Sequence, residues 1–147
     1  GLIPRNLVYK FLTDKKGRLW ISTSSRGLFR VDEPNAETPV FTSFSTANGL
    51  SSNSGYCLAE DKFGRIYVGT GRGINQIDSE TGRIKIFTAN DGLPGSLIGE
   101  CYADVNGTLW FSFTNSLIKF VPEAEKPSSP PPIFIDAINV NGKARAI

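Results

Sequence analysis

The sequence predicts an all-β protein made of three propeller blades, and three observations support this. A motif recurs in register, the apolar residues at its centre are nearly consecutive, and no window has the 3.6-residue apolar period of a helix. The motif is Gly-Arg-Leu-Trp-Ile-Ser-Thr at 17–23, Gly-Arg-Ile-Tyr-Val-Gly-Thr at 64–70 and Gly-Thr-Leu-Trp-Phe-Ser-Phe at 107–113. The copies lie 47 and 43 residues apart, so each marks one repeated unit.

Each unit is expected to contain four short strands. The first, at 8–12 in the first unit, ends at an aspartate that opens a four-residue turn closed by glycine. The second is the central motif, and its consecutive apolar residues indicate burial on both faces of the sheet, as in radially stacked blades. The third begins at Gly27, Gly73 or Ser116, and the fourth covers 40–44 or 84–88.

The fold class is therefore an all-β β-propeller fragment of three four-stranded antiparallel blades, at about 5–50, 51–93 and 94–122. A proline-rich linker is expected at 123–132, followed at 133–147 by one strand of a further domain, with alternating apolar and polar residues. Three blades cannot close a ring, because propellers typically have about 4–8. The exposed outer faces are therefore expected to self-associate into a homodimer.

Composition argues against several kinds of function. The 16 basic and 14 acidic residues are spread along the chain, which gives no patch for nucleic acid or for direct membrane contact. The chain has no histidine, the commonest general base and metal ligand, and its two cysteines form no CxxC motif. We expect no catalytic residues, no metal site and no cofactor.

The two cysteines are not expected to form a disulfide. When the repeats are aligned on Asp61 and Asp104, Cys57 and Cys101 differ by one strand position. Neighbouring positions of a strand point to opposite faces, so each cysteine should pack as a small apolar residue.

Polar loops at one end of the blades are the candidate ligand-binding site. Arg26 and Arg72 each directly precede the glycine that opens the third strand, and Asn115 holds this place in the third repeat. In a propeller these loops gather around the channel mouth with the connections between blades. The candidates are Arg26, Arg72, Asn115, Ser25, Asn48 and Asn90. Donor-rich loops on rigid sheets suit a sugar or a sugar acid, although the same residues also occur in solvated turns.

Two more conspicuous sets of residues are assigned to the framework. Trp20, Tyr67 and Trp110 lie in the middle of the second strands and are expected to be core between blades, not a sugar-stacking platform. The aspartates that open the turns (Asp14, Asp61 and Asp104) are expected to accept backbone N–H groups there and not to bind a metal.

The repeats resemble those of a known family. The pattern Asp-x-x-Gly-x-Leu-Trp-Ile-x-Thr, then Gly-Leu-x-Arg-x-Asp, then Phe-x-x-x-x-Gly-Leu resembles the two-component regulator propeller repeat. The first repeat carries it in full, the second has Tyr67 for tryptophan, and the third has Phe113 for threonine and Ser116 for glycine. Residues 133–147 are similar to the start of the Y_Y_Y immunoglobulin-like domain that follows the last blade in this family.

The resemblance implies a sensor. In this family the propeller belongs to a periplasmic region that precedes a membrane span and a histidine kinase, and several members respond to oligosaccharides. The chain is thus expected to be a non-catalytic periplasmic sensing module for a carbohydrate, with the kinase absent from it. Two alternatives stay open: a propeller enzyme (a lyase or glycan hydrolase), and a structural propeller that binds other proteins.

Overall fold

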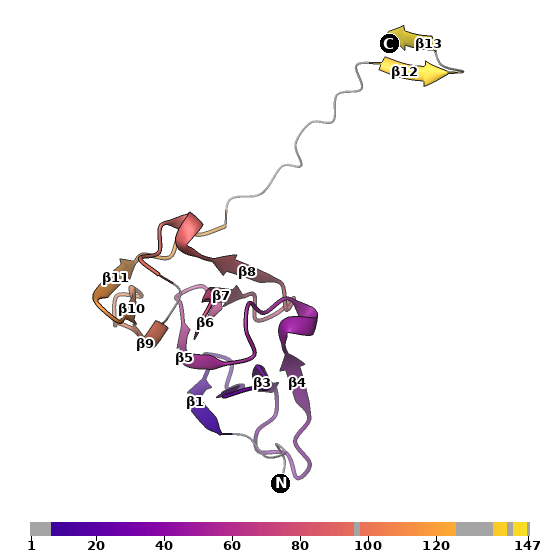
Figure 1. The fold of residues 1–147 in the computed structure, drawn as a ribbon. Helices are drawn as coiled ribbons and strands as arrows, with labels where there is room; N and C mark the ends of the chain where they lie inside the picture. Colours follow the sequence, from indigo (N-terminus) through magenta and orange to yellow (C-terminus); the bar gives the residue numbers. More distant parts are fainter. Residues whose placement is uncertain (1–6, 96–97, 126–136, 141–142, 147) are drawn as a thin grey trace.

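The computed structural model describes residues 7–95, 98–125, 137–140 and 143–146. Figure 1 shows the strands in chain order, with two short 3-10 helices, η1 (Thr46–Asn48) and η2 (Ala89–Asp91). The strands are β1 (Val8–Thr13), β2 (Leu19–Thr23), β3 (Leu28–Val31), β4 (Phe41–Phe44), β5 (Gly55–Glu60), β6 (Ile66–Thr70), β7 (Gly73–Ile77), β8 (Ile84–Phe87), β9 (Ile98–Ala103), β10 (Leu109–Phe113), β11 (Ser116–Phe120), β12 (Ala137–Val140) and β13 (Lys143–Ala146).

The first eleven strands form three antiparallel sheets, which confirms the all-β propeller architecture. Blade 1 has the order β1-β2-β3-β4, blade 2 has β5-β6-β7-β8, and blade 3 has β9-β10-β11. The first strands β1, β5 and β9 lie next to one another, so the blades fan out from them (Figure 1). Strands β12 and β13 pair as a hairpin, so this part of the chain has two strands where one was predicted. Most of the predicted linker at 123–132 lies outside the described residues.

Blade 3 has three strands, not the predicted four, within the residues that the structure describes. The sequence after β11 offers a physical reason: it is rich in proline, which cannot donate to a strand ladder. In the complete blades, Gly27 and Gly73 have positive φ, and a Cβ there would collide with the carbonyl oxygen of the last residue of the fourth strand. In blade 3, where β11 has no described fourth strand beside it, the equivalent residue is Ser116.

Blade 2 is buried on both faces, as its continuous apolar runs predict. Ile66 and Val68 of β6 pack with Trp20 of blade 1, while Tyr67 between them packs with Phe111 of blade 3. All five residues of β6 are buried. Trp20 and Tyr67 are 0% and 1% exposed, which confirms their assignment to the core between blades. The equivalent Trp110 is only half-buried, because its face of blade 3 has no described neighbour.

One aspartate in each blade ties the β1–β2 type of turn to the core aromatic residue. In blade 1 the Oδ1 atom of Asp14 accepts from the N–H groups of Lys16 and Arg18, and its Oδ2 accepts from Arg18 Nε and from Trp20 Nε1 at 2.8 Å. The predicted role in the turn is thus confirmed, and the bond to the aromatic residue adds to it.

The same arrangement recurs in the other two blades. Asp61 accepts from Arg65 and from the Tyr67 hydroxyl at 3.1 Å, and Asp104 accepts from Trp110 Nε1, also at 3.1 Å. In the third repeat Thr108 replaces the arginine and gives only its backbone N–H to the aspartate. In blades 1 and 2, donors of three kinds therefore converge on the turn aspartate: backbone N–H groups, the arginine Nε and the polar group of the aromatic side chain.

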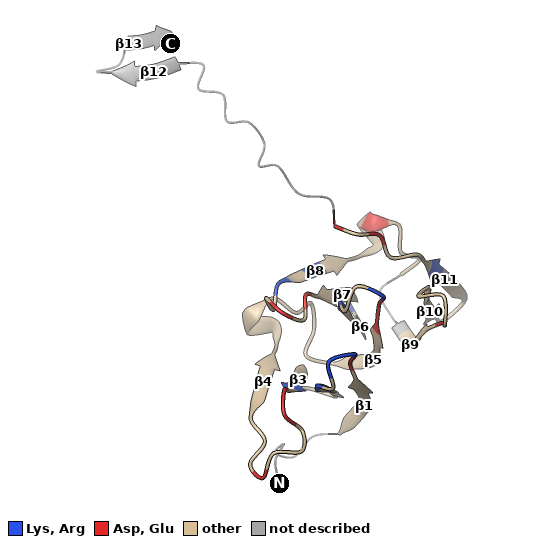
Figure 2. Ribbon diagram, turned by 180° about the vertical axis from the view of Figure 1, so that it is seen from behind, with Lys and Arg blue, Asp and Glu red and all other residues tan. Residues whose placement is uncertain are grey.

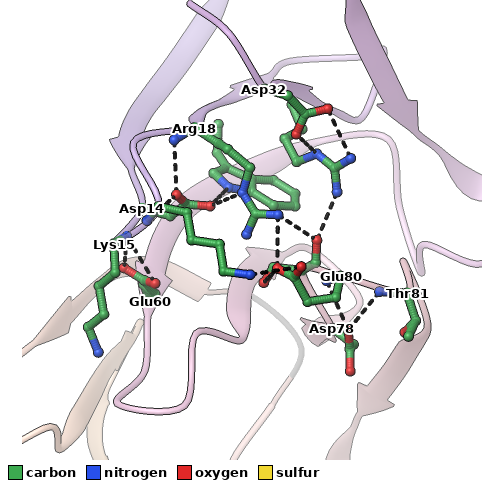
Figure 3. A network of polar contacts seen from close by, with 12 residues as sticks. Asp14, Lys15, Arg18, Asp32, Glu60, Asp78, Glu80 and Thr81 are labelled. Carbon is green, nitrogen blue, oxygen red and sulfur yellow. Dashed lines mark hydrogen bonds and ion pairs between the residues drawn. The ribbon is translucent and has the colours of Figure 1, made fainter.

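In blades 1 and 2, the arginine that binds the turn aspartate also links its blade to the following one. Arg18 donates to Ser79 O at 3.0 Å and pairs with Glu80 of blade 2, as Figure 3 shows. Arg65 makes the equivalent contact in blade 2 by donating to Glu123 O at 2.9 Å, just after β11. In Figure 2, blue and red segments of the ribbon mark charged residues at these turns. We call this end of the blades, which carries Asp14, Arg18, Asp61, Arg65 and Glu80, the charged seam.

Cys57 and Cys101 form a disulfide between β5 and β9, so the prediction that they would stay separate was wrong. The alignment was right: Cys101 is opposite Phe111 in the register, the place that Leu58 holds opposite Val68. The error lay in the conclusion. Alternation separates neighbouring positions within one sheet, but two stacked sheets meet through opposite faces. Positions one apart in the repeat therefore face each other across adjacent blades.

Replacing Asp14 by asparagine should lower the free energy of unfolding by about 2–4 kcal/mol near neutral pH, because only one acceptor oxygen remains for its buried donors. Burial acts to raise the pKa of Asp14, but hydrogen bonds from Trp20 and Arg18 and the charge of Arg18 outweigh it and lower that pKa below 3.8. Such a carboxyl stabilises the fold above its unfolded pKa and loses this contribution as pH falls through the lower folded value.

Urea denaturation of wild type and Asp14→Asn from about pH 7 to about pH 3 checks this, with a part of the acid-induced loss expected to vanish in the variant. Glu33→Gln is the matched control, since that exposed side chain makes no hydrogen bond or ion pair with the residues that the structure describes. Equal stability of Asp14→Asn and wild type at neutral pH would contradict the role of this carboxylate.

Removing the disulfide with the double substitution Cys57→Ser and Cys101→Ser should lower the free energy of unfolding by about 2–4 kcal/mol, because a closed loop restricts the unfolded chain. The bridge spans a sequence separation of 44 residues. Reductant should destabilise wild type and leave the double variant unchanged in thermal denaturation. A wild-type protein insensitive to reductant would contradict a structural bridge.

Candidate ligand-binding face

The loops singled out from the sequence come together at one end of the blades, opposite the charged seam. The loop between β2 and β3 contacts the connection from blade 1 to blade 2, since Gly27 N–H donates to Asn53 O at 2.7 Å and Ser54 Oγ donates to Ser24 O. Ser24 N–H also donates to Leu7 O, just before β1. We call this end the loop face.

Two candidates hold equivalent places on the loop face. Arg26 lies in the β2–β3 loop and Arg72 in the β6–β7 loop, and both are exposed. Each backbone N–H donates to the hydroxyl of a buried threonine, Thr23 or Thr70, which donates in turn to a glycine carbonyl. The threonine thus fixes the backbone of each arginine. Neither guanidinium has an ion-pair partner within the part of the chain that the structure describes.

Asn48 is a structural residue of the loop that follows β4. Its Oδ1 accepts from Ser45 N–H, which completes the capping box of η1, and its Nδ2 also donates to Ser43 O at 3.0 Å. In η2 the same role belongs to Asp91, whose carboxylate accepts from the N–H of the N-cap residue Thr88. Asn90, the other candidate, is therefore one position away from the equivalent of Asn48, and only its backbone N–H is engaged at this cap.

The remaining candidates, Asn115 and Ser25, are exposed in the β10–β11 and β2–β3 loops. In the third repeat Phe113 stands in place of the fixing threonine, so the loop of Asn115 lacks the side-chain bond found in blades 1 and 2. The role of all six candidates in binding stays a prediction.

Two tyrosines that were not predicted as site residues also lie at the loop face. The first strand of each blade carries one extra residue, because the register shifts between Val8 and Lys10 and again between Gly55 and Cys57. The bulge residues are Tyr9 and Tyr56, whose rings stack with centroids 5.7 Å apart. Their common position, five residues before the turn aspartate, was the signal available in the sequence.

A charged pair crosses from blade 1 to blade 3 beside these bulges. Lys10 Nζ lies 2.8 Å from Glu100 Oε1, and both side chains are partly exposed. In the repeat, these residues hold the position of Cys57 in blade 2. The first strands of the blades are therefore bridged twice, by this ion pair between blades 1 and 3 and by the disulfide between blades 2 and 3.

Two cavities, of about 770 and 330 Å³, open between blades 2 and 3. Both lie beside β11, which is the outer strand of blade 3 among the described residues, and Phe87 and Phe120 line each of them. Ile84 of β8 packs against the core between blades 1 and 2, and no described residue of blade 3 takes its place. The cavities are thus accounted for by an uncovered blade edge.

No group of histidine, cysteine, aspartate or glutamate in the described ranges is placed to hold a metal ion. Among the same residues, no helix has the length and apolar character needed to cross a bilayer.

Comparison with known proteins identifies the repeat. Residues 2–25 and 49–72 match the family model of the two-component regulator propeller. No curated protein matches the chain. These two matched segments include the turn aspartates and second strands of blades 1 and 2, together with the bulge tyrosines.

Solved structures share the fold. The extracellular domain of BT3049 from B. thetaiotaomicron, a proposed hybrid two-component system, is 27% identical with a TM-score of 0.70 over 84% of this chain and 16% of that one. The extracellular domain of BT4673 from the same organism is 25% identical with a TM-score of 0.69 over 80% of this chain and 17% of that one. A catalytically inactive virginiamycin B lyase from Staphylococcus aureus is 16% identical with a TM-score of 0.57 over 82% of this chain and 44% of the lyase, which shows the fold alone.

This chain thus spans about one sixth of the length of these two extracellular domains. The match of the family model and the shared fold agree with the repeat pattern found in the sequence. Residues 2–25 and 49–72 of the chain are similar to repeats of the two-component regulator propeller family.

Proposed function

We propose that this chain is a non-catalytic part of a periplasmic two-component sensor, which binds a carbohydrate and passes the signal to a histidine kinase outside the chain. Two of the similar solved structures are extracellular domains of proposed two-component systems, which supports a sensor role. The disulfide between Cys57 and Cys101 supports an oxidising compartment such as the periplasm.

The observation that carries the binding proposal is the pair of arginines on the loop face. Arg26 and Arg72 are exposed on neighbouring blades, each with a backbone fixed by a buried threonine. A guanidinium without an intramolecular carboxylate can make paired hydrogen bonds to the carboxylate or sulfate of a ligand. This favours an acidic oligosaccharide, with its sugar hydroxyls bound by the polar loops around the arginines.

A propeller enzyme is the main alternative. The lyase of similar fold was made inactive by replacing a histidine with alanine, and this chain contains no histidine. The turn aspartates, which are the repeated acidic residues, are occupied by Arg18, Arg65 and the core aromatic residues. These observations support binding without catalysis, and turnover of a glycan by this chain would count against the proposal.

Calorimetry against a panel of neutral, uronic-acid and sulfated oligosaccharides tests this function. Wild type should bind an acidic member, and the double variant Arg26→Gln with Arg72→Gln should bind it roughly a hundredfold more weakly, since each of the two lost charge-assisted contacts contributes about 1.5 kcal/mol or more. Arg83→Gln is the control, because Arg83 is also exposed but pairs with Glu125 near the other end of blade 2. Absence of binding to the whole panel would overturn the carbohydrate proposal.

We also propose that the outer blade faces self-associate. Phe11 on blade 1 and Leu117 on blade 3 are each 63% exposed, at the repeat positions where Leu58 and Ile74 are buried between blades. The two faces that are buried in blade 2 are therefore each exposed once, on the outer side of blade 1 and on the outer side of blade 3. A second copy could cover these faces by joining blade 3 of one chain to blade 1 of the other.

Light scattering over a concentration series checks the association, with dimers expected to increase with concentration. Leu117→Asp should shift the chain toward monomers, because a carboxylate at the face cannot be desolvated without a partner. Lys85→Asp, an exposed change on β8 away from these faces, is the control. A monomeric wild type at high concentration would contradict the proposal.

A further inference from the structure

We infer that Tyr9 and Tyr56 form a stacking platform for a pyranose ring of the ligand. This inference rests on the proposed carbohydrate binding and adds the part of the site that would recognise the apolar face of a sugar. The residues lie on the same loop face as Arg26 and Arg72 but on different elements, the first strands β1 and β5.

The bulges explain why these two rings lie outside the core. Within a regular strand, alternate side chains enter the packing between blades, as Cys57 and Leu58 do on the two faces of β5. An extra residue breaks this alternation and turns its side chain in a new direction. Tyr9 is 42% exposed and Tyr56 is half-buried, whereas Tyr67 in the core is 1% exposed.

The hydroxyl groups separate the two tyrosines from the structural one. Tyr67 donates to Asp61 and accepts from Gln76 at 2.7 Å, as expected of a tyrosine that belongs to the framework. The structure gives the hydroxyls of Tyr9 and Tyr56 no hydrogen-bond partner among the residues it describes. They can therefore bond to the hydroxyl groups of a ligand without breaking an internal contact.

The stack ends where a third ring would continue it. The repeat position of Tyr9 and Tyr56 is occupied in blade 3 by Gly99, which has no side chain. Among the residues that the structure describes, no aromatic ring stacks on the side of Tyr56 toward blade 3, whereas Tyr9 stacks on its other side. A pyranose ring is about as large as a tyrosine ring, so a sugar could stack on Tyr56 in the place that a third tyrosine ring would take.

The β6–β7 loop passes close to the ring of Tyr56. Gly71, the residue before Arg72, lies beside the ring of Tyr56, and a Cβ there would be 3.8 Å from Tyr56 Cε2. The loop that carries Arg72 thus passes the edge of the platform. An apolar ring face with polar groups at its rim matches a sugar, which has C–H groups on its faces and hydroxyls around its edge.

The test uses the whole chain and the tightest-binding oligosaccharide of the panel described above. Tyr56→Leu should weaken binding roughly five- to tenfold, the range expected for loss of one ring contact. Tyr9→Ala should weaken it less, because Tyr9 supports the ring of Tyr56 from the side away from the sugar. Phe63→Ala is the matched control, because Phe63 is a partly exposed aromatic residue in the β5–β6 turn, at the charged seam. Circular dichroism and thermal denaturation verify that each variant is folded.

A readout that does not depend on the variants comes from the ring-proton resonances of Tyr9 and Tyr56 in wild type, which should shift on titration with the sugar. If the sugar binds but the tyrosine variants keep wild-type affinity, or if these resonances do not move, the platform is wrong and carbohydrate binding stands. If tyrosine substitution lowers thermal stability without changing affinity, the pair is only structural and the inference fails. If no sugar on the panel binds, the proposed function fails and the platform with it.

Discussion

The structure depends on one carboxylate in each blade. Asp14, Asp61 and Asp104 each close a turn through backbone N–H groups and fix the aromatic residue at the centre of the second strand. A buried carboxylate is costly unless its acceptor positions are filled, and here they are filled by groups that must be positioned anyway. The turn, the aromatic core and the charged seam are consequently held in one relative arrangement.

That arrangement allows blades to be stacked in series. The arginine bound to the aspartate reaches the following blade, and the aromatic residue packs on the same neighbour. Stacking works because each sheet offers one set of alternating residues to the blade before it and the other set to the blade after it. The disulfide between Cys57 and Cys101 follows the same geometry and adds a covalent link between blades 2 and 3.

The two ends of the blades, the charged seam and the loop face, differ in how their side chains are used. At the charged seam nearly every group is paired, as Arg18, Glu80 and Asp78 illustrate, and backbone bonds from Thr81 lower the pKa of Asp78. At the loop face the backbone is fixed by buried hydroxyls, but the arginine and tyrosine side chains remain available. A rigid framework with open side chains is the arrangement that a binding surface needs, because little conformational entropy is lost on association.

Sequence by itself determined the repeat, its strands and their order, since turn residues and apolar runs act locally and recur in register. It also determined which aromatic and acidic residues build the blade. Only the tertiary structure decided how blades face each other, and for that reason the cysteine pairing was predicted wrongly. Asn48 was selected for its polarity, yet a local cap uses its side chain. Tyr9 and Tyr56 became visible only when the bulge register was known, because a single extra residue redirects a side chain without changing the repeat pattern.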